Sequence, residues 1–206
     1  MNDPDLATTF TADAAKVHGV GAERLQALQA FNARLVCMTV DDDSYQEIVR
    51  GISRVTGCDA CALFLYDANA EELELKANIG YGELDAQPRI SVHDPADAHA
   101  HAFREEYLVH VDNMVEEPGM RVLSAEMVSI LVLPVISNRG PVGVFEFGSR
   151  IPSAFSAQDI GLCSMAVDQM AYSLENIRLV GELSQTRDAV IRGMALLAEI
   201  RDSHIG

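Results

Sequence analysis

The chain has 206 residues, enough for one domain with flanking helices. Its 31 acidic and 15 basic residues give a formal net charge of −16, and so acidic a surface repels nucleic-acid backbones and anionic lipid headgroups. No apolar run approaches the roughly 20 residues of a membrane helix and the N-terminus lacks a signal-peptide pattern. We therefore expect a cytoplasmic protein, or the cytoplasmic portion of one, that binds neither nucleic acid nor membrane.

The first predicted elements are helical. Residues 1–21 form a leader with weak periodicity, and apolar residues then recur at helical spacing from Ala22 to Met38. Ser44 and Glu47 fit a capping box that opens a second helix, which Gly57 ends.

Short strands follow this second helix. Residues 61–66 form an apolar run too short for a helix, and residues 73–77 alternate in the manner of a half-exposed partner strand. A short strand at 89–92, a small helix within 93–106 and a strand at 107–111 come next.

The clearest hairpin joins residues 128–136 to residues 142–147. Both runs are rich in β-branched or aromatic side chains, and residues 137–140 supply the turn. Pro134 predicts a bulge or an edge position, because proline cannot donate a ladder hydrogen bond.

The last helix opens with strong signals and carries a heptad-like apolar stripe. Ser156 and Asp159 can cap it, and Phe155 can pack onto Ile160. We expect its early turns to pack on the domain, and its edges and distal turns to pair in a parallel homodimer with the helix near Leu25. The stripe residues assigned to the dimer helix are Val167, Met170, Leu174 and Ile177.

This order of elements predicts an α+β fold with an antiparallel sheet of about five or six strands and the terminal helices on one face. Residues 57–67, the hairpin around 133–145 and residues 155–159 resemble, in this order, three stretches of the GAF domain. The resemblance implies a sensory domain over 22–178, after the leader at 1–21.

The C-terminal segment carries a second resemblance. Residues 194–206 resemble the first helix of HD-GYP-type cyclic-di-GMP phosphodiesterases, whose metal-binding motifs would lie downstream. We therefore expect 179–206 to be a signalling helix and the start of a missing effector domain, in a bacterial signalling protein. The chain by itself is not expected to be an enzyme.

The GAF resemblance also implies a ligand pocket on the sheet face opposite the terminal helices. Candidate pocket residues are Phe64, Tyr66, His93, His99, His101, Phe103, His110 and Met127. His99 and His101 are two apart, so they would not chelate one metal from a helix, and no metal site is expected. A single histidine could instead be an axial haem ligand, with His99 and His110 as candidates. Alternatively, all four histidines are ordinary surface or core residues.

The cysteines favour a structural role. Cys58 and Cys61 form a CxxC pair, but no second pair completes a zinc site. We interpret the pair as small buried apolar residues. Reactive cysteines of the GAF-like methionine sulfoxide reductases and chromophore cysteines of bilin-binding relatives lie near the pocket, where this chain has none.

The main hypothesis is a regulatory sensor whose unidentified small ligand or cofactor acts through the terminal helix on the effector. One alternative is a haem-based gas sensor. Another is a ligand-free dimerisation scaffold whose pocket is filled by Phe103, Met114 and Met127. A histidine-kinase input domain with His204 as phosphoacceptor is a further alternative. Catalysis is not expected, because no nucleophile and base are visible together.

Overall fold

The computed structural model describes residues 42–82, 84 and 88–202, and residues 26, 29, 30 and 33 as isolated helical positions. In the last helix, side chains beyond residue 175 are described only at 187 and 190–192. The predicted leader, Leu25 and His204 lie outside the described residues. None of the described helices is long and apolar enough to cross a membrane.

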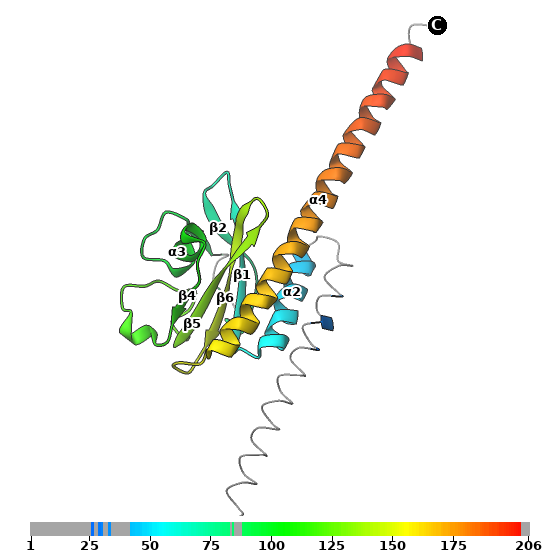
Figure 1. The fold of residues 1–206 in the computed structure, drawn as a ribbon. Helices are drawn as coiled ribbons and strands as arrows, with labels where there is room; N and C mark the ends of the chain where they lie inside the picture. The colour runs from blue at the N-terminus through cyan, green and yellow to red at the C-terminus, as the bar shows by residue number, and fades with distance from the viewer. Residues whose placement is uncertain are drawn as a thin grey trace, which may run out of the picture.

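A six-stranded antiparallel sheet forms the centre of the domain, in the order β3-β2-β1-β6-β5-β4 (Figure 1). The strands are β1 Ala60–Asp67, β2 Glu72–Ile79, β3 Arg89–Ser91, β4 Val109–Val111, β5 Ser129–Ser137 and β6 Gly140–Ser149. Each lies within two or three residues of a predicted strand. The predicted α+β class is therefore confirmed.

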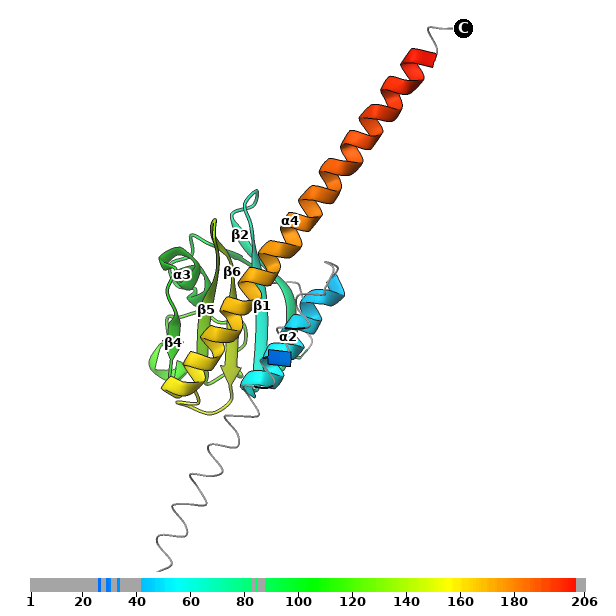
Figure 2. The same ribbon diagram turned by 45° about the vertical axis from the view of Figure 1, so that its right-hand side comes forward.

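Two helices cover one face of the sheet and a third covers the other. Helix α2 (Asp42–Thr56) packs on β1 and β2 beside helix α4 (Ala157–Asp202), which packs on β5 (Figure 2). Helix α3 (Ala98–Glu105) packs on β5 and β6 from the opposite side, and a 3-10 turn, η1 (Met114–Glu116), follows β4.

The ends of α2 only partly follow the prediction. Helix α2 begins at Asp42 instead of directly after Ser44, so Ser44 and Glu47 lie inside its first turns and the predicted capping box is wrong by three residues. Gly57 ends the helix as predicted. It has φ of +72° and donates a hydrogen bond to the carbonyl of Ser53 at 2.8 Å, a conformation that glycine adopts without a steric penalty.

Helix α4 starts as predicted and runs without interruption for 46 residues. Ser156 Oγ donates to Asp159 Oδ2 at 2.6 Å, and the backbone N–H of Asp159 donates to Ser156 Oγ at 3.3 Å, so the capping box is formed. The distal half of the helix projects beyond the sheet (Figures 1 and 2). No break occurs near Gly181, where the apolar stripe shifts register.

The structure corrects part of the predicted dimer stripe. Val167, Met170 and Leu174 are buried against the sheet of their own chain, because the helix presents this side to β5. They are therefore not available to a second chain. The side chain of Ile177 lies outside the described residues.

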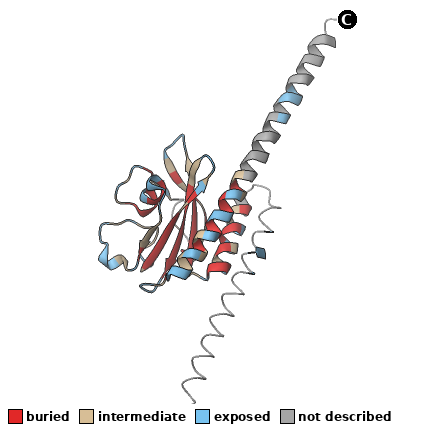
Figure 3. Ribbon diagram, in the orientation of Figure 1, coloured by how far each residue is buried: buried red, intermediate tan, exposed pale blue. Residues whose placement is uncertain are grey.

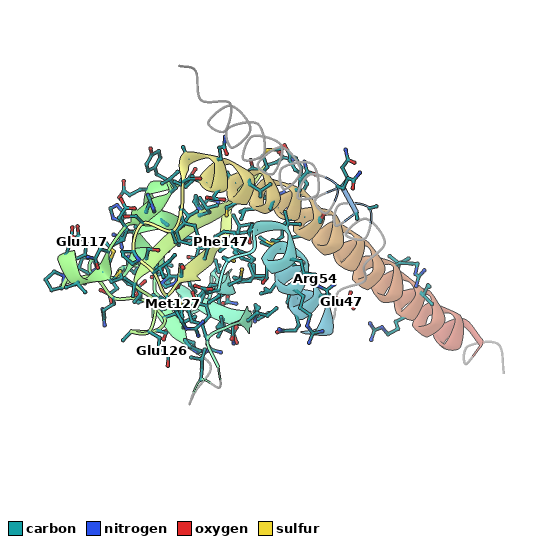
Figure 4. The ribbon with its side chains drawn as sticks, turned by 90° about the horizontal axis from the view of Figure 1, so that it is seen from below. Glu47, Arg54, Glu117, Glu126, Met127 and Phe147 are labelled. Atoms are coloured by element: carbon teal, nitrogen blue, oxygen red, sulfur yellow. The ribbon has the colours of Figure 1, made fainter. Side chains whose placement is uncertain are left out.

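The period-two alternation of the strands gives the sheet two apolar faces (Figure 3). The face under α2 and α4, called the helix face here, holds residues such as Leu63, Leu131 and Phe147. The face under α3, called the α3 face, holds Phe64 and Met127 among others. Figure 4 labels Phe147 and Met127, which lie toward and away from α4 respectively.

Pro134 occupies an edge position, as the sequence predicts. Strand β4 pairs only with residues 130–132 of β5, so β5 has no outer neighbour at Pro134, and the ladder to β6 shifts register between Val135 and Ile136. The missing N–H therefore interrupts no pairing on that side.

Candidate functional site

The α3 face contains a charged network inside an otherwise apolar cluster. Glu146 in β6 pairs in register with Ala62 and Val132, and its carboxylate points to the α3 face. Glu146 and His99 are both 0 % exposed. A carboxylate is almost never fully buried unless it is paired, so its partners matter.

Two side chains contact Glu146, and a third completes the network through His99. His99 Nε2 makes a short contact with Glu146 Oε2, and Tyr81 Oη donates to Glu146 Oε1 at 2.6 Å. On the other side of the ring, His99 Nδ1 lies 2.9 Å from Asp97 Oδ1. His99 thus bridges two carboxylates.

The local sequence places each member of the network. Asp97 is the N-cap of α3, and its Oδ1 accepts hydrogen bonds from the backbone N–H groups of His99 and Ala100 at 2.8 and 3.4 Å. This cap fixes the first turn of α3, and His99 in that turn faces β6. Gly148 leaves room for Tyr81, because a Cβ there would lie 2.8 Å from Tyr81 Oη.

The geometry requires a proton between His99 and its partners. Both ring nitrogens face carboxylate oxygens, which accept hydrogen bonds, so only a doubly protonated ring or a protonated carboxyl satisfies both contacts. Burial alone would lower the pKa of His99. The charge of Glu146 and the hydrogen bonds with Asp97 and Glu146 outweigh burial and raise the pKa of His99 to about 9.

Tyr81 remains neutral in this setting. Burial and the negative charge of Glu146 raise the pKa of its phenol well above the ordinary value. It therefore acts as a hydrogen-bond donor to Glu146.

Four other candidate pocket residues share the α3 face with His99. The Phe64 ring lies 4.7 Å from the His99 ring, and the Tyr66 and Phe103 rings are also 4.7 Å apart. Met127 is buried in the same cluster. Aromatic pairs at this separation are attractive and well packed.

Three predicted histidines lie elsewhere. His93 is exposed and pairs with Glu71 at 3.0 Å, and His101 is exposed on the outer side of α3. His110 lies opposite Leu131 of the helix face and its ring contacts Phe155 edge-on at 6.2 Å. The expectation that these residues line one pocket with His99 is therefore wrong, because alternation in β4 and the solvent side of α3 direct them away.

The arrangement does not fit haem on His99, because both of its nitrogens are already engaged by carboxylates. His110 Nε2 is buried without a hydrogen bond, because Asp112 Oδ1 at 3.6 Å is too distant to accept one. This nitrogen lies on the helix face of the sheet, whereas His99 lies on the α3 face. Among the described residues, no group of histidine, cysteine, aspartate or glutamate side chains could hold a metal ion.

Sequence reasoning missed Glu146, Tyr81 and Asp97. Glu146 had a detectable signal, since it is a carboxylate in the middle of the apolar run Val142–Phe147 and alternates with core residues. Asp97 also stands where an N-cap is expected, directly before the Ala-rich helix. Tyr81 had no such signal, because its partner is 65 residues away.

A separate groove of about 490 Å³ lies where the tips of the two hairpins meet α4. Tyr66, Arg139 and Glu175 are among its lining residues. The carboxylate of Glu175 accepts a hydrogen bond from the backbone N–H of Asn138 at 3.3 Å, which ties the β5–β6 turn to α4.

One family model matches more than half of the chain. Residues 42–174 match the family model described as the GAF domain. No curated protein sequence matches the chain.

Solved structures with the same fold come from proteins of different activity. The GAF domain of the Acinetobacter phosphoenolpyruvate-protein phosphotransferase is 18% identical, with a TM-score of 0.67 over 77% of this chain and 96% of that one. The free methionine-R-sulfoxide reductase of Neisseria meningitidis, solved with its substrate, is also 18% identical, with a TM-score of 0.68 over 77% and 92%. A methyl-accepting chemotaxis protein fragment is 16% identical, with a TM-score of 0.63 over 73% and 98%. At these identities the similarity establishes the fold.

Proposed function

The chain belongs to the GAF domain family, whose members are regulatory sensory domains that bind small ligands, and from this premise we propose that it senses a small molecule on the α3 face and signals through α4. The observation that carries the proposal is the fully buried His99–Glu146 pair between α3 and the central strand β6. A charged pair is a costly way to fill a core, because apolar side chains of similar volume are often at least as stable. Its presence supports a binding role.

The network indicates the chemistry of the ligand. Two carboxylates, Asp97 and Glu146, face one imidazolium, so the site is rich in hydrogen-bond acceptors. A ligand that presents a cationic or hydrogen-bond-donating group fits Glu146, with the Tyr66–Phe103 ring pair nearby for an apolar portion. Because His99 and Glu146 are completely buried, such a ligand enters only when α3 moves away from β6.

Movement of α3 can bias α4 because both helices pack on the same strand. Helix α3 contacts β5 from one face and α4 contacts it from the other. The side chains of Val132 and Leu133, adjacent on β5, point to these two faces. A ligand shifts the arrangement of α4 only by its difference in affinity for the two arrangements.

The output side of the proposal has two parts. The chain forms a parallel homodimer through its terminal helices, supported by the exposed apolar side chains Met165 and Tyr172, which lie seven residues apart on α4. The effector is a cyclic-di-GMP phosphodiesterase, supported by the resemblance of residues 194–206 to the start of an HD-GYP domain.

Ligand binding is tested with a panel of small metabolites and the thermal unfolding midpoint. We expect at least one amine- or amide-bearing compound to raise the midpoint of the unmodified chain in a concentration-dependent manner. The shift should disappear in Glu146→Gln and persist in Glu117→Gln, which makes the same change at an exposed carboxylate (Figure 4).

Two results would contradict the site. A panel without a stabilising compound argues against a ligand of this class. A compound that stabilises Glu146→Gln as strongly as the unmodified chain binds elsewhere, with the groove beside α4 as the first place to examine.

A further inference from the structure

Three cysteines meet on the helix face near the start of α4, on the opposite side of the sheet from the His99 network. Cys58 lies between α2 and β1, Cys61 is in β1 and Cys163 is in the second turn of α4. The Sγ atoms of Cys58 and Cys61 are 2.9 Å apart. The prediction that the pair serves only as apolar filling does not account for this contact, because sulfur atoms at that distance share a hydrogen bond.

The two sulfurs of the pair differ in their access to solvent. Cys58 is half-buried and lines a pocket of about 340 Å³, together with Asp59, Ser149 and Cys163. Cys61 is completely buried directly behind it. A small reagent that enters the pocket therefore reaches Cys58 first.

The two sulfurs also differ in acidity. The hydrogen bond from the Cys61 thiol is the largest influence on Cys58 and, with the Thr56 hydroxyl at 3.1 Å, it lowers the pKa of Cys58 despite partial burial. Burial raises the pKa of Cys61 well above its ordinary value. The accessible sulfur is thus the better nucleophile at neutral pH, and its neighbour stays protonated.

We propose that Cys58 and Cys61 form a peroxide-sensitive dithiol that closes reversibly to a disulfide. The site consists of the accessible Cys58 sulfur, the Cys61 thiol hydrogen-bonded behind it, and a pocket large enough for a small molecule. The substrate class is a small hydroperoxide, with hydrogen peroxide as the simplest member. This inference does not depend on a ligand at the α3 face.

The reaction proceeds in two balanced steps. The Cys58 thiolate attacks one oxygen of the hydroperoxide, the O–O bond breaks, and the other oxygen leaves as an alcohol or water after it takes a proton, which gives a sulfenic acid. The Cys61 sulfur then attacks the Cys58 sulfur, and the displaced hydroxide leaves as water with the Cys61 proton. The peroxide gains the two electrons that the sulfurs lose. An added dithiol then reduces the disulfide back to the two thiols by thiol–disulfide exchange and is itself oxidised to a disulfide.

Closure requires only a small displacement. The S–S distance must shorten from 2.9 Å to about 2.05 Å, the length of a disulfide bond. Cys58 follows directly after the end of α2, where the chain is not part of a helix or strand. The pair also lies against Cys163 and the first turns of α4, so the oxidation state bears on the packing of the output helix.

The experiment uses the whole chain with Cys37→Ser, so that only the three described cysteines remain. The reduced protein is treated with hydrogen peroxide, quenched, alkylated with N-ethylmaleimide and analysed by intact and peptide mass spectrometry. We expect the loss of two alkylatable thiols within one chain, a Cys58–Cys61 cross-linked peptide, and full recovery with dithiothreitol.

Single variants assign the roles. Cys58→Ala should abolish the disulfide. Cys61→Ala should instead accumulate a sulfenic acid on Cys58 that dimedone traps. Cys163→Ala is the matched control, because it removes a thiol from the same pocket, and the disulfide should form at a rate within about twofold of the parent.

Several outcomes would overturn the proposal. They are retention of all three alkylatable thiols after peroxide treatment, a disulfide that requires Cys163, or a disulfide only between chains. The first and third of these outcomes are measured on the parent chain alone, so a folding defect in Cys58→Ala or Cys61→Ala does not affect them. Only the second needs a variant, Cys163→Ala, and it counts only when that variant unfolds at the same urea concentration as the parent.

Discussion

Glu146→Gln should remove most of the pH dependence of stability between pH 6.5 and pH 9. The pKa of His99 rises from 6.5 in the unfolded chain to about 9 in the folded one. Between these values the folded state holds one more proton than the unfolded state, so the free energy of unfolding falls as pH rises. The contribution is fully present below pH 6.5 and is lost as pH passes through 9.

The magnitude follows from the shift. The rise in the pKa of His99 from 6.5 to about 9 corresponds to about 3–4 kcal/mol, at roughly 1.4 kcal/mol for each tenfold change in proton affinity. The glutamine variant keeps Asp97 beside His99, so its loss between pH 6.5 and 9 should be smaller, but not zero. The two stability curves should therefore converge as pH rises. The proton count is the same whether the proton resides on the imidazole or on the carboxyl.

The assay is urea unfolding monitored by circular dichroism from pH 5.5 to pH 10 at constant ionic strength. The pKa of Cys58 is lowered, which adds stability as pH rises, opposite in sign to His99. Comparing variants that all keep Cys58 cancels this contribution. Glu117→Gln, at an exposed carboxylate, should follow the unmodified chain. Parallel curves for the unmodified chain and Glu146→Gln would refute the argument that the charge of Glu146 raises the pKa of His99.

Two further predictions concern the same face and the outer surface of α4. Gly148→Ala should lower the free energy of unfolding, measured in urea, by about 1–3 kcal/mol, because the new methyl group would lie 2.8 Å from Tyr81 Oη and the Met127 side chain. An unchanged free energy of unfolding would mean that Tyr81 moves aside without cost. Tyr172→Glu should lower the average molecular mass measured by analytical ultracentrifugation from that of a dimer toward that of a monomer. Tyr107→Glu makes the same change at a similarly exposed tyrosine on the α3–β4 loop and should leave the mass unchanged. Equal masses for the two variants would contradict the proposed role of α4 in dimerisation.

Local patterns in the sequence were sufficient for most of the elements. The alternation in residues 73–77 and the turn before Val142 identify strands, because a strand turns each successive side chain to the opposite face. The Ser156–Asp159 box identifies the start of α4, since its hydrogen bonds lie within four residues. The capping box predicted at Ser44 placed the start of α2 three residues too late, because the same residue types also occur within a first helical turn.

Only some residues of the functional site could be identified from the sequence. His99 stood out by residue type, and Phe64, Tyr66, Phe103 and Met127 came from the family resemblance. Their partners did not stand out, since Glu146 is 47 residues from His99 and 65 from Tyr81 along the chain. The same holds for the stripe on α4, which has identical spacing whether it meets a sheet or a second chain.

The sequence by itself determined the class of fold, the order of its elements and the acidic surface that repels polyanions, because these depend on periodicity, caps and composition. Only the tertiary structure decided which histidine is buried, which carboxylates share its proton and that the sulfurs of Cys58 and Cys61 touch. Those features arise where separate segments converge on one face of the sheet. Their electrostatics come from burial and mutual distance, which no local pattern encodes.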